Sequence, residues 1–170
     1  MRRFILPAVL LCILVVPVGS AAKRGPESPG SLSIRAGRGE VILQVKGAVI
    51  GRLASGKLTL TDNDPYDEQV PAVRGRLRPR PRSASYGTTV YSGRHIRFRV
   101  LNGSYRLKID GVGINLSAVG RGWVTLDGDE RYLNTGAYAL NGEVYQPIPY
   151  ERTDRLKIGG PSIPPSQQSP

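Results

Sequence analysis

Apolar and charged residues alternate strictly on either side of Asn102-Gly103, and this pattern constrains the fold more than any other feature of the chain. The apolar members are Ile96, Phe98, Val100, Tyr105, Leu107 and Ile109. The basic residues between them are Arg97, Arg99, Arg106 and Lys108. Because side chains alternate between the two faces of a β-strand, this spacing predicts strands with one apolar face for a core and one basic face.

Asn102-Gly103 itself predicts that these strands form a β-hairpin. Asn and Gly tolerate the positive φ that both central residues of a type I′ turn require. In the resulting register Phe98 faces Leu107, while Arg99 faces Arg106 and Arg97 faces Lys108. Like charges that face each other across two strands destabilise a sheet unless solvent, a carboxylate or an anionic partner relieves them. The basic hairpin face is therefore the first candidate binding site.

A second group of arginines precedes the hairpin and alternates in the same way. Its members are Arg74, Arg76, Arg78, Arg80 and Arg82. Pro79 and Pro81 favour an extended path, so we expect a loop or edge strand that extends the basic face. The competing interpretation is a solvated surface, or one covered by the acidic residues nearby.

The segment from Val41 to Thr61 predicts a meander of three short strands. Its breaks fall at Lys46-Gly47 and Ser55-Gly56. If the first break is a tight turn, Leu43 and Ile50 face each other and both belong to the core, together with Ile96, Phe98, Leu107 and Ile109.

The same arrangement begins again at Tyr105, 64 positions after Val41. Gly47 then aligns with Gly111, and Gly56 aligns with Gly120, which indicates an internal duplication. No stretch has the helical period of 3.6 residues with caps. The predicted fold class is therefore all-β, an antiparallel β-sandwich or partly open barrel built from two meander repeats.

The ends of the chain are typical of a secreted protein. Residues 1–22 have the pattern of a signal peptide, residues 23–39 of a flexible leader, residues 40–160 of a single β-domain and residues 161–170 of a disordered tail. An uncleaved anchor is the alternative for the first segment. Cys12 would leave with the signal, which excludes disulfides and thiol chemistry in the mature chain.

The charge of the chain favours anionic partners. Without Arg2 and Arg3, 22 basic residues stand against 13 acidic ones, a net charge of +9. Such a field attracts anionic cell-wall polymer or acidic polysaccharide. The alternative is that the arginine content only reflects a GC-rich genome. Aromatic residues are too sparse among the basic ones for a single-strand nucleic-acid platform, so no specific nucleic acid is predicted.

Two acidic turns offer oxygen ligands of the kind that Ca²⁺ prefers. One is Asp62-Asn63-Asp64 with Asp67 and Glu68, and the other is Asp127-Gly128-Asp129-Glu130. Asx turns that close hairpins explain these residues equally well. We therefore predict neither a metal nor another cofactor.

His95 is the single histidine, and it has Ser92 close in sequence and Asp110 as its expected partner across the hairpin. A hydrolytic triad also needs a nucleophile on a strained turn and an oxyanion hole, and the sequence indicates neither. No catalytic residue and no enzymatic activity are predicted.

Aromatic residues gather in the C-terminal part of the domain. They are Trp123, Tyr132, Tyr138, Tyr145 and Tyr150. Aromatic faces pack against sugar rings, so a carbohydrate-binding surface is one interpretation. Core and edge positions of strands are the other.

The segment from Ser117 to Gly122, followed by a strand, resembles segments of uncharacterised secreted β-rich proteins of high-GC bacteria. The resemblance covers about residues 38–160 and implies no activity. The predicted function is a secreted or cell-envelope domain that binds anionic polymer through the basic hairpin face. The alternatives are a structural or protein-interaction module without a small ligand, and a carbohydrate-binding module.

Overall fold

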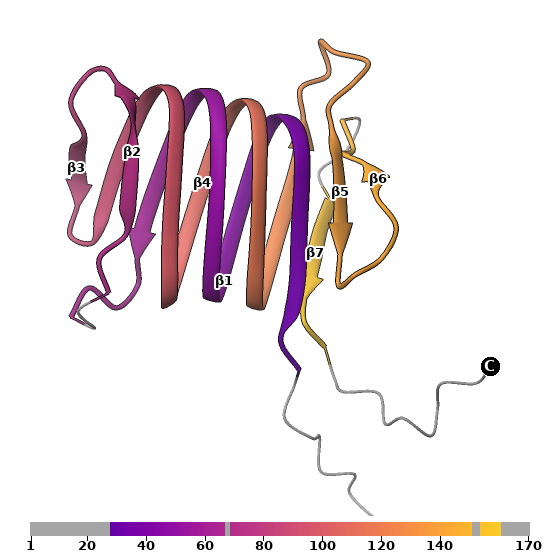
Figure 1. Cartoon of the computed structure of the whole chain (residues 1–170), viewed down its shortest axis with the longest axis horizontal. Helices are drawn as coiled ribbons and strands as arrows, with labels where there is room; N and C mark the ends of the chain where they lie inside the picture. The colour runs from indigo at the N-terminus through magenta and orange to yellow at the C-terminus, as the bar shows by residue number, and fades with distance from the viewer. Residues whose placement is uncertain (1–27, 67–68, 151–153, 161–170) are drawn as a thin grey trace, which may run out of the picture.

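The computed structural model describes residues 28–66, 69–150 and 154–160, and Figure 1 shows its seven strands. The strands are β1 (Gly30–Asp62), β2 (Ala72–Leu77), β3 (Arg82–Ser85), β4 (Thr88–Gly128), β5 (Ala137–Leu140), β6 (Gln146–Pro147) and β7 (Asp154–Ile158). All their pairings are antiparallel, and the described residues contain no helix. The predicted all-β fold class is confirmed.

The two long strands, β1 and β4, wind around a common axis. Val41 pairs with Ile109 on one side and with Leu126 on the other. Ile109 in turn lies between Val41 and Leu58, which are 17 residues apart in the chain. Each strand therefore returns to the same partner strand after one turn. Figure 1 shows the result, a flattened coil in which turns of β1 and β4 alternate.

The coil has two walls with the core between them. The front wall is defined by the paired row Val73, Phe98, Gly51, Leu116, Ile34 and Tyr138. The back wall is defined by the paired row Leu156, Val124, Leu43, Leu107 and Leu60. The sheet follows the path β2-β4-β1-β5-β6 and is not closed into a barrel. This arrangement is consistent with the predicted sandwich or partly open barrel.

The alternating pattern identified the core correctly, apart from Ile50. All six apolar residues around Asn102-Gly103 are buried, as is Leu43. Ile50, however, is 55% exposed and lies on the outside of the front wall. The chain makes no tight turn at Lys46-Gly47, so odd-numbered positions such as Val45 and Val49 continue to point inward.

The predicted hairpin at Asn102-Gly103 is wrong. β4 continues through this position without reversing its direction beside itself. Phe98 pairs with Gly51 and Val73, and Leu107 pairs with Leu43 and Leu60. Asn102 does adopt the expected left-handed conformation, with φ of 49°, whereas Gly103 does not. A single left-handed residue shifts the alternation by one position. Even-numbered residues before it and odd-numbered residues after it therefore point into the same core.

The breaks that suggested meander turns are corners where the chain passes from one wall to the other. Glycines of successive turns pair with one another at these corners. One column contains Gly128, Gly39, Gly111, Gly56 and Gly93, and the other contains Gly30, Gly120, Gly47 and Gly103. A Cβ atom on Gly47 would collide with the carbonyl oxygen of Val119, and one on Gly56 with that of Asp110. The corners need glycine because backbones approach closely there. Successive segments of β1 pair with β4 and not with each other, so the predicted hairpin-linked meanders are wrong.

The ordered domain also begins earlier than expected. Gly30–Gly39 is part of β1, where Leu32 and Ile34 are buried, so this stretch is not a flexible leader. Ser28 N donates to Gly160 O at 2.8 Å, which joins the two ends of the domain. The predicted signal at residues 1–22 and tail at residues 161–170 lie outside the described residues. The predicted edge strand among the arginines is confirmed as β2.

Gly103→Val is expected to lower the free energy of unfolding by about 1–3 kcal/mol, because it overpacks the core. A Cβ atom at this position would lie 2.5 Å from Cζ and 2.6 Å from Oη of Tyr105, whose ring is buried. Chemical denaturation measures the change. In a Tyr105→Leu background, where the ring is absent, the same substitution should be less costly. Equal losses in the two backgrounds would contradict this packing.

Candidate functional site

Three arginines lie side by side on the outside of the front wall and form what we call the arginine row. Arg74 of β2 pairs with Arg97 of β4, and Arg97 pairs with Arg52 of β1. All three side chains are exposed. Because neighbouring strands lie about 4.8 Å apart, the row places three cations at that interval along the coil axis.

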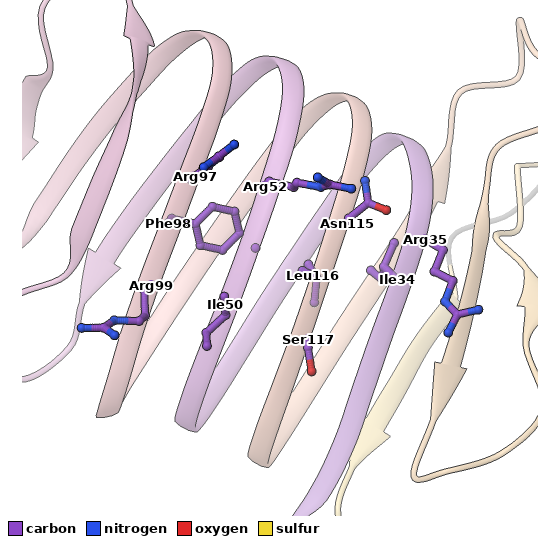
Figure 2. A pocket seen from close by; sticks show the side chains of 11 residues that line it. Ile34, Arg35, Ile50, Arg52, Arg97, Phe98, Arg99, Asn115, Leu116 and Ser117 are labelled. Atoms are coloured by element: carbon purple, nitrogen blue, oxygen red, sulfur yellow. The ribbon is translucent and has the colours of Figure 1, made fainter.

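The row continues toward the C-terminal end of the coil. Arg52 also pairs with Asn115, and Asn115 Oδ1 accepts a hydrogen bond of 3.2 Å from Ala36 N, next to Arg35. Figure 2 shows Arg97, Arg52, Asn115 and Arg35 following one another along the wall. With Arg74 at its other end, this line of charged and amide side chains therefore crosses five neighbouring strand segments along the coil axis.

A shallow hollow of about 660 Å³ lies beside the arginine row. Its floor is the middle row of the front wall, where Phe98, Leu116 and Ile34 point into the core and Gly51 has no side chain. Arg97, Arg52 and Asn115 form one rim, and Arg99, Ile50 and Ser117 form the other (Figure 2). The hollow thus runs along the coil axis between a strongly basic rim and a mixed one.

No carboxylate faces the arginine row in the described part of the chain. The outward positions of the two rims and their extensions are Arg74, Arg97, Arg52, Asn115, Arg35, Ala72, Arg99, Ile50, Ser117 and Ser33. The ion pairs found among the described residues are Lys108 with Glu40 and Arg131 with Asp129, and neither involves this wall. The front wall is therefore a cationic surface to which the described residues supply no counter-charge.

The predicted basic hairpin face does not exist as a single surface. Arg97 and Arg99 lie on the front wall, whereas Arg106 and Lys108 lie on the back wall. The cause is the corner at Asn102, which carries the chain to the other wall instead of reversing it beside itself. On the back wall Lys108 Nζ lies 2.7 Å from Glu40 Oε2, so its charge is already paired.

The remaining arginines of the predicted loop are spread around one end of the coil. Arg76 pairs with Arg94, Arg78 N donates to Ser92 O at 2.9 Å, and Arg82 pairs with Val90. Arg80 and Arg82 line a separate hollow. Of the five arginines from Arg74 to Arg82, Arg74 is therefore the one that belongs to the arginine row.

The predicted aromatic cluster is also divided. Tyr138 belongs to the core, Trp123 lies on the back wall with Arg155 Cζ 4.9 Å from its ring centre, and Tyr132 lies under Arg38 at 4.7 Å. Tyr145 and Tyr150 line one common hollow of about 530 Å³. Tyr145 and Tyr150 are therefore the members of the predicted cluster that share this surface depression.

The hollow with the two tyrosines adjoins the front wall. Arg35 lines both hollows, and its Cζ atom lies 4.0 Å from the ring centre of Tyr145. The Tyr145 hydroxyl shares a hydrogen bond of 2.6 Å with Ser33 Oγ. Asn134 and Gln146 also line this hollow. Arg35 thus links the arginine row to an aromatic hollow at its end.

His95 and Asp110 do not form the expected pair. His95 is exposed on the front wall, two residues after the corner at Gly93, with φ of 53°. Asp110 lies beside the same column of corner glycines, but on the back wall and on another turn, where it pairs with Glu40 and Lys57. The separation follows from the absence of the hairpin that would have placed them opposite each other.

The acidic turns are held by local hydrogen bonds. Asp129 Oδ2 accepts from Arg131 Nη2 at 2.7 Å and Oδ1 accepts from Nε at 2.8 Å. These bonds from Arg131 lower the pKa of Asp129. Asp62 Oδ1 accepts from Asp64 N at 3.0 Å, as in an Asx turn. Within residues 28–66, 69–150 and 154–160, no group of three or more His, Cys, Asp or Glu residues is placed to hold a metal ion.

Sequence reasoning missed Arg52, Asn115 and Arg35 as members of the site. They come from three other turns of the coil, two of β1 and one of β4, and each is an isolated polar residue among apolar neighbours. The only available signal was the alternation itself, which places Arg52 outward between Gly51 and Leu53.

No family model, no curated protein and no solved structure matches this chain. In the described part of the chain there is no helix of the length and apolarity that crossing a membrane requires. Fold and site together define an all-β protein whose two longest strands form a coil with one cationic wall.

Proposed function

We propose that the front wall binds a linear anionic polymer and that the protein acts in this way outside the cytoplasm, as a secreted or cell-envelope domain without catalytic activity. The observation that carries the proposal is the arginine row, in which Arg74, Arg97 and Arg52 face one another across three neighbouring strands. The signal-like pattern of residues 1–22 supports the location.

The physical argument is one of charge complementarity. Like charges at directly opposed positions repel each other, which costs stability while the surface is empty. A polymer that carries closely spaced negative groups turns this repulsion into attraction. Arginine is suited to the role because its guanidinium group makes bidentate hydrogen bonds to carboxylate, sulfate or phosphate. The strands hold the backbones of these arginines in register, so less conformational entropy is lost when the side chains bind the polymer.

The hollow beside the row gives the polymer a path. It runs along the coil axis, as the row does, and Arg99 lies on the opposite rim (Figure 2). A linear chain that follows the hollow would meet cations on both sides. Its backbone would rest over the middle row, whose side chains point into the core, between the two rims.

The variant Arg97→Gln with Arg52→Gln is expected to weaken binding to polyanions by at least tenfold, on the order of 1.4 kcal/mol. The slope of log affinity against log salt concentration should become shallower by about 2, because two fewer anionic groups are neutralised. Fluorescence anisotropy with labelled inorganic polyphosphate and labelled polygalacturonate measures both quantities. Both substitutions are at exposed sites, so thermal unfolding should change little.

A matched control distinguishes the arginine row from net charge. Arg106→Gln with Lys108→Gln removes the same two charges from the back wall, and its affinity should stay within about twofold of the wild type. If the two double variants lose affinity equally, the row is not the binding site. If the wild type binds neither probe at low salt, the protein is better described as a structural or protein-interaction module.

A further inference from the structure

The hollow lined by Tyr145 and Tyr150 has the composition of a site for a sugar ring. Tyr150 is 40% exposed and presents a planar apolar surface. Asn134 and Gln146 line the same hollow, where Asn134 Oδ1 accepts a hydrogen bond from Gly136 N at 3.0 Å and Gln146 Oε1 accepts one from the Tyr138 hydroxyl at 3.4 Å. A pyranose ring has apolar C–H faces and polar hydroxyls at its rim, so it fits an aromatic face that is surrounded by hydrogen-bonding amides.

This hollow adjoins the proposed polymer path at Arg35. Arg35 belongs to the linings of both hollows and stands at the end of the succession that Figure 2 shows. Its guanidinium group rests over Tyr145, 4.0 Å from the ring centre. Arg35 would therefore bind the acidic group of a sugar whose neighbour packs against Tyr150.

The position of the aromatic rings argues against nucleic acid as the polymer. Proteins that bind single strands stack successive bases on exposed aromatic rings along the whole groove. Along the arginine row the one aromatic residue of the lining is Phe98, and it is only 2% exposed. The wall is also built of flat strand rows, without a helix or projecting ribbon that would enter a duplex groove.

We infer that the Tyr145–Tyr150 hollow is a sugar-ring subsite at the end of the arginine row, and that the polymer is an acidic polysaccharide. This inference rests on the proposed function of the front wall and adds the ligand class. The row binds the acidic groups of successive sugars, Arg35 binds the acidic group nearest the end, and Tyr150 packs against one ring.

Tyr150→Ala separates ring packing from charge. We expect it to weaken binding of a labelled polygalacturonate oligomer by at least about tenfold, the effect of losing one aromatic contact with its buried area. Binding of inorganic polyphosphate, which has no rings, should stay within about twofold. Tyr150→Phe keeps the ring and should bind both probes like the wild type. Tyr145 is the poorer choice for substitution, because its hydroxyl is bonded to Ser33.

The outcomes distinguish this inference from the proposal on which it rests. If Tyr150→Ala weakens both probes equally or weakens neither, the sugar subsite is wrong while the arginine row stands. If a labelled oligothymidylate binds more tightly than polygalacturonate and loses more affinity in Tyr150→Ala, the polymer is a nucleic acid and the inference is overturned. If the wild type binds none of the three probes, the polymer-binding function itself fails.

Discussion

Phe98→Ala is expected to lower the free energy of unfolding by about 3–5 kcal/mol, the usual cost of removing a buried phenylalanine ring. Phe98 is buried within the front wall and reaches across to the neighbouring turn of β1. Its ring occupies the space above Gly51, where a Cβ atom would collide with Cζ. The ring thus fills two positions of the core, its own and the one that a side chain at Gly51 would occupy.

The shared space makes the prediction testable in a second way. Gly51→Val should destabilise the wild type by overpacking and should restore part of the stability of Phe98→Ala, because it refills the cavity. Leu101→Ala, at a position that is 39% exposed, serves as a control of similar chemistry and should cost much less. Chemical denaturation measures all of these variants. A loss below about 1 kcal/mol for Phe98→Ala would be inconsistent with this core.

Gly47→Val is expected to lower the free energy of unfolding by about 3 kcal/mol or more, the sum of backbone strain and overpacking. Gly47 has φ of 154°, in a region that residues with a Cβ rarely adopt. A side chain there would meet the carbonyl oxygen of Val119 on the next turn. The carbonyl belongs to a paired backbone, so it cannot move away without breaking the coil.

Two companion variants test the corner. Gly160→Ala is the matched control, because a Cβ atom there has nothing within 4 Å, and its effect should be within about 0.5 kcal/mol. Gly47→Asn distinguishes the corner from a hairpin turn. Asparagine is favoured in tight turns with positive φ, whereas at this corner its Cβ meets the same carbonyl oxygen. Tolerance of asparagine would favour the hairpin that the sequence first suggested.

The site shows why the binding surface could be predicted only in part. The sequence indicated that Arg97 and Arg99 point away from the core, and they do. The hairpin prediction placed them beside Arg106 and Lys108, because it assumed that the chain reverses at Asn102. Arg106 and Lys108 lie on the other wall. The actual neighbours, Arg74 and Arg52, come from β2 and β1. Pairings between such distant segments depend on the packing of the whole coil, which no local pattern encodes.

The sequence by itself determined which side chains point inward on both sides of Asn102, because alternation at a period of two has one physical meaning on a pleated strand. It also marked the places where the backbone changes direction, since glycine and Asn102 mark conformations or close approaches that other residues resist. Only the tertiary structure decided what those changes of direction are. A hairpin and a corner use the same residues. At Asn102 they also keep the same faces apolar, whereas at Lys46-Gly47 the corner directs Val49 inward in place of Ile50. They differ in whether a strand pairs with its own continuation or with a distant segment, and that choice is made by the burial of both walls against one core.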